Sequence, residues 1–214
     1  MCSSSVGGDN FTADCSIFSV ASQSFAECPP VPTGRGYLGA AVVGSTLYAI
    51  GGYAETGWDT VESFDQSTQE WTLHLPALPT PRYGLVAATL GTKVFAIGGV
   101  AYHIPASAAV EILDTTTMTW SAGSPLITPR SYPAAAVMDG LIYVVGGADY
   151  FGNNLQSVEV YSPIAGWQKG PDLLSPGRSH LAVAAQAGFL VVAGGSAGQD
   201  PNTYSVTQVE SYHT

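Results

Sequence analysis

The sequence predicts an all-β protein assembled from repeated four-stranded units, and two observations support this prediction. Glycine contributes 25 and proline 14 of the 214 residues, a turn-rich composition that helical bundles seldom have. Gly-Gly pairs also recur at steps of 47, 48 and 48 residues, starting at Gly51, Gly98, Gly146 and Gly194. A fixed period of this length is typical of propellers and solenoids.

Three further features share this period. An arginine stands before each Gly-Gly pair, a Val-Glu pair follows it, and a tryptophan follows three of the four Val-Glu pairs. The arginines are Arg35, Arg82, Arg130 and Arg178, the glutamates are Glu62, Glu111, Glu159 and Glu210, and the tryptophans are Trp71, Trp120 and Trp167.

Each unit is consistent with four short strands. The first follows the arginine, as in 38–43 and 134–138, and a tight glycine turn leads to a second that ends at Gly-Gly. The third strand surrounds Val-Glu and the fourth surrounds the tryptophan. The first two strands are apolar on both faces, as in sheets that are covered on both sides, whereas the outer two alternate. Stacking such sheets around an axis buries their faces and gives a β-propeller.

The order arginine, two apolar strands ending in Gly-Gly, Val-Glu strand, tryptophan and proline resembles the kelch repeat, which forms one propeller blade per unit. The resemblance covers residues 34–212 and part of the preceding segment. We therefore expect a flexible segment, 1–13, followed by one kelch-type propeller, 14–214. Its expected units are 14–33 (partial), 34–80, 81–128, 129–175 and 176–214 (partial).

The two ends of the repeat region complement each other. The last unit stops after its Val-Glu strand, whereas residues 14–33 resemble the third and fourth strands of a unit that lacks its first half. Kelch propellers commonly close by letting one terminus complete the blade begun by the other. On that model the strand around Phe25 pairs beside the strand around Val209, and the ring has about four blades. The alternative is an open arc or part of a larger assembly.

Two cysteines fall in the N-terminal partial unit. If Phe18 pairs with Phe25 in a hairpin, Cys15 lies directly opposite Cys28, within disulfide range. The alternative is two buried free thiols in a reducing compartment. A glycosylation sequon at Asn10 favours an oxidising compartment, but no secretory signal sequence precedes it. The sequence therefore leaves the localisation open.

The formal net charge of −10 and the absence of clustered lysine or arginine argue against a nucleic-acid partner and an anionic membrane surface. No apolar stretch is long enough to span a bilayer. An arginine at one equivalent position in every unit is best interpreted as structural. We expect each to pair with the repeated glutamate or with backbone carbonyls.

Catalytic and metal-binding motifs are poorly supported. The four histidines lie in different units without paired spacing. Kelch proteins that redirect glucosinolate breakdown hold iron through Glu, Asp and His at four-residue steps, and the nearest match here is Glu55, Asp59 and Ser63. Galactose-oxidase-like propellers need a cysteine within the repeats, which this chain lacks. We expect no metal, no cofactor and no catalytic residue.

The long loops 53–60, 100–109, 148–157 and 196–205 share one face, because the strands alternate in direction. Variable loops on a rigid scaffold commonly carry recognition. In BTB-kelch ubiquitin-ligase adaptors, the residues just after the arginine and just after Gly-Gly line the peptide-binding mouth. The resemblance implies a partner-binding set of Tyr37, Tyr53, Tyr83, Tyr102, His103, Ser131, Tyr132, Asp149, Tyr150, Ser179, His180 and Ser196.

The preferred function is a non-catalytic protein-interaction or scaffold module that holds a peptide or a subunit of a complex on this face. Tyrosine rings with polar tips are common interface anchors, although several of them could instead plug the channel beneath the rim. The alternatives are a carbohydrate-binding or carbohydrate-modifying protein of lectin, oxidase or mutarotase type, and a structural subunit of a large complex.

Overall fold

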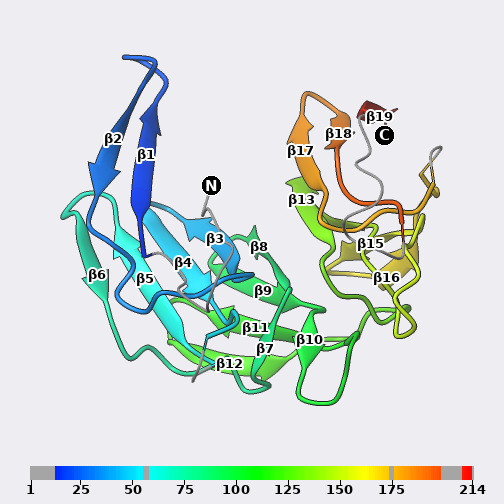
Figure 1. Ribbon diagram of the computed structural model, residues 1–214, viewed down its shortest axis with the longest axis horizontal. Coiled ribbons are helices and arrows are strands. Elements are labelled where there is room, and N and C mark those ends of the chain that lie inside the picture. The colour runs from blue at the N-terminus through cyan, green and yellow to red at the C-terminus, as the bar shows by residue number, and fades with distance from the viewer. Residues whose placement is uncertain (1–12, 55–57, 174–175, 199–208, 214) are drawn as a thin grey trace.

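The computed structural model describes residues 13–54, 58–173, 176–198 and 209–213, and every regular element in them is a strand (Figure 1). Three sheets have four antiparallel strands each, and we call them blades one to three. Blade one contains β3 (Gly39–Val43), β4 (Thr46–Ile50), β5 (Val61–Asp65) and β6 (Glu70–Thr72); blade two contains β8 (Val86–Leu90), β9 (Lys93–Ile97), β11 (Val110–Asp114) and β12 (Thr119–Ala122); blade three contains β13 (Ala134–Met138), β14 (Leu141–Val145), β15 (Val158–Ser162) and β16 (Gly166–Lys169).

The remaining strands form smaller sheets. Blade four contains β17 (Ala182–Gln186), β18 (Phe189–Ala193) and β19 (Val209–His213), and an N-terminal hairpin contains β1 (Cys15–Ser19) and β2 (Ser24–Cys28). The two-residue strands β7 (Arg82–Tyr83) and β10 (Val100–Ala101) pair with each other beside blade two. The repeat units seen in the sequence thus each form one sheet, and the fold is an all-β arrangement of kelch-type blades.

The blades form an open arc (Figure 1). The first strands of neighbouring blades contact one another from β3 to β8, from β8 to β13 and from β13 to β17. Within the described residues β2 pairs only with β1, and β19 pairs only with β18. Ring closure by pairing of the strand around Phe25 with the strand around Val209 is therefore wrong, and the open-arc alternative holds.

A repeated tryptophan contact explains why the hairpin lies at the other end of the arc from β19. The indole N–H of Trp120 donates to a carbonyl that precedes blade two, at Pro76 (2.8 Å), and Trp71 donates to Pro29 beside the hairpin (2.9 Å). This contact places the hairpin before blade one as the outer half of a blade.

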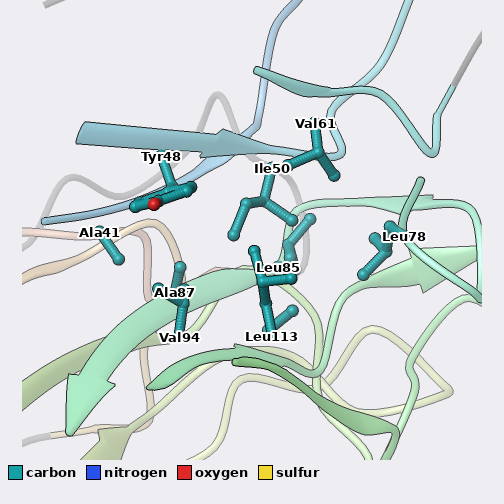
Figure 2. Packing of buried hydrophobic residues seen from close by; sticks show 10 residues of the cluster. Ala41, Tyr48, Ile50, Val61, Leu78, Leu85, Ala87, Val94 and Leu113 are labelled. Atoms are coloured by element: carbon teal, nitrogen blue, oxygen red, sulfur yellow. The ribbon is translucent and has the colours of Figure 1, made fainter. Parts of the chain in front are cut away.

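The core lies between the blades. Ile50 and Tyr48 from blade one pack against Leu85, Val94 and other residues of blade two (Figure 2). Two further clusters of the same kind join blade two to three and blade three to four. Because aliphatic side chains dominate these interfaces, their removal from water stabilises the stacking of the blades.

The repeated arginines are buried and hold each blade to the segment before it. Arg35 pairs with Glu62 at 2.5 Å, Arg130 pairs with Glu159 at 2.5 Å, and Arg82 pairs with Glu111. The same guanidinium groups donate to backbone carbonyls, as Arg35 Nε does to Gly51 (2.7 Å). Arg178 is equally buried, but the side chain of Glu210 lies outside the described part of the chain.

The N-terminal hairpin carries a disulfide between Cys15 and Cys28, whose Cα atoms are 5.1 Å apart in directly opposed register. The rings of Phe18 and Phe25 face each other across the same hairpin, with centroids 5.0 Å apart. The expected flexible segment, apart from residue 13, and the sequon at Asn10 lie outside the described residues.

Candidate functional site

The two groups of residues proposed for partner binding are joined by backbone pairing. In every blade the segment after the arginine forms an antiparallel bridge with the segment after Gly-Gly. The bridged pairs are Gly36 with Tyr53, Tyr83 with Val100, Ser131 with Ala148 and Ser179 with Ser196. Repeated bridges of this kind hold both loops at fixed places on the end of each blade.

A chain of backbone hydrogen bonds then links the blades along their inner edge. The second residue after each arginine has a positive φ: Tyr37 (56°), Gly84 (61°), Tyr132 (51°) and His180 (55°). The amide of Gly84 donates to Tyr37, that of Tyr132 to Gly84 and that of His180 to Tyr132, at 2.8, 2.8 and 3.1 Å. The left-handed conformation, which non-glycine residues seldom adopt, thus recurs where each blade is tied to the next.

Six rings from the loops of all four blades form a continuous cluster, which we call the aromatic belt. Its members are Trp58, Tyr53, Tyr83, Tyr37, Tyr132 and His180. Successive ring centroids along this path are 5.5, 5.2, 6.3, 5.6 and 4.1 Å apart, with tilted or edge contacts except for the stacked Tyr132–His180 pair. Such geometry is favourable for aromatic pairs.

Gly84 makes room for the belt. A Cβ atom at this position would lie 2.8 Å from Cε1 of Tyr132, closer than van der Waals contact permits. The tyrosine ring therefore covers the place where the other three blades carry a side chain.

A pocket of about 200 Å³ opens between the loops of blades three and four. It lies beside the stacked end of the belt, and Asn154 Nδ2 connects its two sides by donating to the carbonyl of Gly198 (2.9 Å). The lining residues are Pro105, Ser131, Tyr132, Ala148, Asp149, Gly152, Asn154, Ser179, His180, Ser196 and Gly198.

The electrostatics of the pocket are set by three groups. Burial raises the pKa of Tyr132, and the neighbouring Tyr83 raises it further, so the phenol stays neutral. Partial burial lowers the pKa of His180 below 6.5, so the imidazole is also neutral near pH 7. Although burial acts to raise it, the pKa of Asp149 is lowered by hydrogen bonds from the Asn153 side chain and from backbone amides. The carboxylate is consequently ionised.

Other predicted residues project from the loop tips. The reciprocal backbone bonds between Ala101 and Ile104 (3.0 and 2.9 Å) form a tight turn that carries Tyr102 and His103 outward. Their ring centroids are 4.0 Å apart, and Tyr102 is 74% exposed. In blade three Tyr150 projects beside Phe151, with centroids 5.5 Å apart.

The twelve predicted residues therefore divide into three groups. Tyr37, Tyr53 and Tyr83 belong to the belt alone. Tyr132 and His180 belong to both the belt and the pocket, which Ser131, Asp149, Ser179 and Ser196 also line. Tyr102, His103 and Tyr150 lie on loop tips. The sequence reasoning missed Trp58 in the belt, Asn154 in the pocket and Phe151 on a tip.

The arrangement suits recognition by hydrogen bonds and ring contacts. Three serines, one aspartate and one histidine are among the residues that line the pocket. Within the described ranges no group of three histidine, cysteine or acidic side chains could hold a metal ion. No helix in the described part of the chain is long and apolar enough to cross a membrane.

Comparison with known proteins agrees with the geometry. A family model described as the KLHDC2/KLHL20/DRC7 Kelch-repeats domain matches residues 5–195. The chain belongs to the kelch-repeat family. Among solved structures, YjhT matches with a TM-score of 0.71 and 17% sequence identity, over 80% of this chain and 63% of that chain.

The kelch chain thus spans less than two thirds of the length of YjhT. At this identity the likeness concerns the fold. Comparison with curated protein sequences gives no match.

Proposed function

We propose that this kelch chain is a non-catalytic interaction module that holds a protein partner on its long-loop face. The observation that carries the proposal is a set of large exposed apolar side chains on loop tips next to the pocket. Phe151 is 81% exposed, and Tyr102, Tyr150 and Ile104 are exposed beside it or on the neighbouring loop. Aromatic anchors around a pocket are characteristic of protein interfaces.

The charge distribution supports a partner with a basic surface. All four arginines are buried, so only Lys93 and Lys169 remain to offset the acidic side chains of a chain with a net charge of −10. Complementary charge accelerates association and disfavours acidic competitors. Acidic peptides, which meet exposed arginines in BTB-kelch adaptors, would find none on this face.

A carbohydrate ligand is the second candidate, because residues with hydrogen-bonding side chains are among those that line the pocket. Serine hydroxyls, Asn154 and Asp149 are groups that bind sugar hydroxyls. However, the exposed apolar side chains on the loop tips, led by Phe151 at 81% exposed, are better suited to a protein surface than to sugar hydroxyls. We therefore rank a protein partner first.

The test compares two faces of the same molecule. The double variant Tyr102→Ala/Phe151→Ala removes two exposed rings from the loop tips. Ile164→Ala removes an exposed apolar side chain from the β15–β16 turn, at the other end of the blade. Truncation of interface anchors should weaken the complex with a co-purified, cross-linked partner by about tenfold or more, whereas the control variant should bind like the wild type.

Three further readouts complete the experiment. Both variants should unfold at the wild-type temperature, because none of the three side chains is buried. Glycan-array and turnover screens should be silent. Loss of the partner only in Ile164→Ala, or saturable glycan binding that depends on the loop tips, would contradict the proposal.

A further inference from the structure

We propose that the pocket between blades three and four binds the guanidinium group of an arginine side chain of the protein partner. This inference rests on the proposed function and specifies the chemistry that the face recognises. It follows from the size of the pocket, its charge, the orientation of its acceptors and its stacked rings.

The size of the pocket suits one side chain. Its volume of about 200 Å³ lies below the roughly 300–1,000 Å³ of pockets that take drug-sized ligands or cofactors. The loops of blades three and four, linked by the bond between Asn154 and Gly198, supply most of the wall, and Pro105 of the blade-two loop completes it. A single long side chain can therefore enter it from a partner that rests on the loop tips.

The charge of the pocket selects a cation. Among the described residues that line it, Asp149 is the only charged one, since His180 is neutral near pH 7 and none of the others ionises. The ionised carboxylate of Asp149 attracts a positive group. An anionic ligand would be repelled.

One oxygen of Asp149 remains able to accept a charged donor. Oδ1 accepts from the amides of Phe151 (2.9 Å) and Asn153 (2.8 Å). Among the described residues, Oδ2 accepts from Asn153 Nδ2 (3.0 Å). Because a carboxylate oxygen has two lone-pair sites, Oδ2 can take a further donor, and the hydrogen bonds already made fix its orientation.

A second acceptor is unsatisfied. The Ser196 hydroxyl is buried and has no hydrogen-bond partner within the described part of the chain, although buried polar groups normally have one. Ser196 lines the same pocket as Asp149. A guanidinium has five N–H donors in a fixed planar fork, so it can serve several acceptors at once.

The stacked rings favour arginine over lysine. Tyr132 and His180 both line the pocket and are nearly parallel, with an interplanar angle of 22° and centroids 4.1 Å apart. A planar guanidinium stacks on such rings and tolerates loss of water better than an ammonium group does. Lysine would supply the charge without the fork or the plane.

The experiment titrates the protein with N-acetyl-arginine amide and follows the backbone amide signals of Ser131, Ser196 and Gly198 by NMR. Saturable shifts are expected. The citrulline analogue, which keeps the shape but lacks the charge, should bind about tenfold more weakly. The affinity for the lysine analogue should lie between those for the arginine and citrulline probes, and galactose should not bind.

Matched variants locate the effect. Asp149→Asn should lower the affinity for the arginine probe by about tenfold, and Ser196→Ala should lower this affinity by less. Asp114→Asn is the control, because Asp114 also accepts turn amides, at Thr116 and Thr117, but lies in the β11–β12 turn at the other end of its blade. This variant removes the same charge and should bind the probe like the wild type.

The outcomes separate the two proposals. If the probe does not saturate, or binds equally to Asp149→Asn and wild type, the arginine pocket is wrong. The interaction face still stands in that case if the Tyr102→Ala/Phe151→Ala variant loses the partner. If that variant keeps the partner, the face itself is wrong. Galactose binding that depends on Asp149 would replace both by the carbohydrate candidate.

Discussion

The buried glutamates offer a sharp comparison, because their hydrogen-bond partners differ in one chemical respect. Glu159 accepts only from obligate donors: Ile127 N (2.7 Å) reaches Oε2, and Thr128 N (2.9 Å) and Arg130 Nη2 (2.5 Å) reach Oε1. Glutamine replaces one oxygen by an NH₂ group. In Glu159→Gln that group must face an N–H donor, whichever way the amide is turned.

Glu111 and Glu62 differ from Glu159 in one of their hydrogen-bond donors. Their second oxygen accepts from a threonine hydroxyl, Thr80 (2.8 Å) or Thr33 (2.8 Å) respectively. A hydroxyl can rotate and accept instead. Glu111→Gln and Glu62→Gln can therefore keep every hydrogen bond and lose only the charge.

The expected magnitudes follow from this difference. Removing one partner of a buried ion pair costs about 3–5 kcal/mol, and we expect Glu159→Gln in that range. The other two variants should be milder by the cost of one unsatisfied buried donor, about 1–3 kcal/mol. For a chain of this length, that difference corresponds to roughly 2–12 °C in Tm.

The assay is thermal unfolding followed by far-UV circular dichroism at pH 7. Glu62→Gln serves as the exposure control, since the side chains of Glu62 and Glu159 are both 2% exposed whereas that of Glu111 is 11% exposed. Partner binding should be unchanged once the variants are folded. Equal Tm values for Glu159→Gln and Glu62→Gln would refute the reasoning.

Three other predictions follow. Burial lowers the pKa of His180, so the unfolded chain binds more protons than the folded chain just below pH 6.5, and stability falls on acidification. Between pH 7 and pH 5, the Tm of His180→Gln should therefore fall less than the Tm of the wild type. An equal fall in both proteins would count against this prediction. A Cβ atom at Gly98 would lie 2.6 Å from a backbone carbonyl oxygen, whereas Gly91 has a similarly positive φ but open space around it. Gly98→Ala should therefore lower the free energy of unfolding, measured in urea, by about 1–3 kcal/mol more than Gly91→Ala does. Similar losses in the two variants would mean that the carbonyl moves aside. Replacing Cys15 and Cys28 by serine should remove about 3 kcal/mol of hairpin stability and raise hydrogen exchange in β1 and β2 only; faster exchange throughout the blades would contradict this.

The strands could be predicted from the sequence because local signals agree with one another. Apolar runs, tight glycine turns and the fixed period all point to the same boundaries, and 134–138 is observed as β13. The pairing of Arg35, Arg82 and Arg130 with the repeated glutamates was also expected, because a charge at a repeated buried position needs a partner.

Ring closure could not be predicted in this way. The angle between neighbouring blades results from many side-chain contacts in the interfaces, and small differences accumulate along the arc. The sequence shows that the hairpin and blade four are complementary halves, but it does not show whether they meet.

The site was only partly predictable for a similar reason. Family positions led to residues that the structure places in the belt and the pocket, whereas the tight turn at Ala101 and Ile104 holds Tyr102 on a loop tip; their role in binding stays a prediction. Trp58 left a usable signal, because it is the one tryptophan of four that does not follow the repeat period. The carbonyl of Trp58 accepts from the amide of Arg82, and the carbonyl of Ser107 accepts from the amide of Arg130, both at 3.0 Å. Ser107 is therefore the counterpart of Trp58 in the next unit.

The missing side chain at Gly84 has a consequence for evolution and engineering of this surface. Because Tyr132 occupies the vacated volume, a single methyl group added there would displace the phenol and unstack it from His180. The shape of the aromatic belt in one repeat thus depends on a residue in the previous repeat. Swapping whole repeats between paralogues would fail to transfer specificity unless the upstream neighbour were transferred as well.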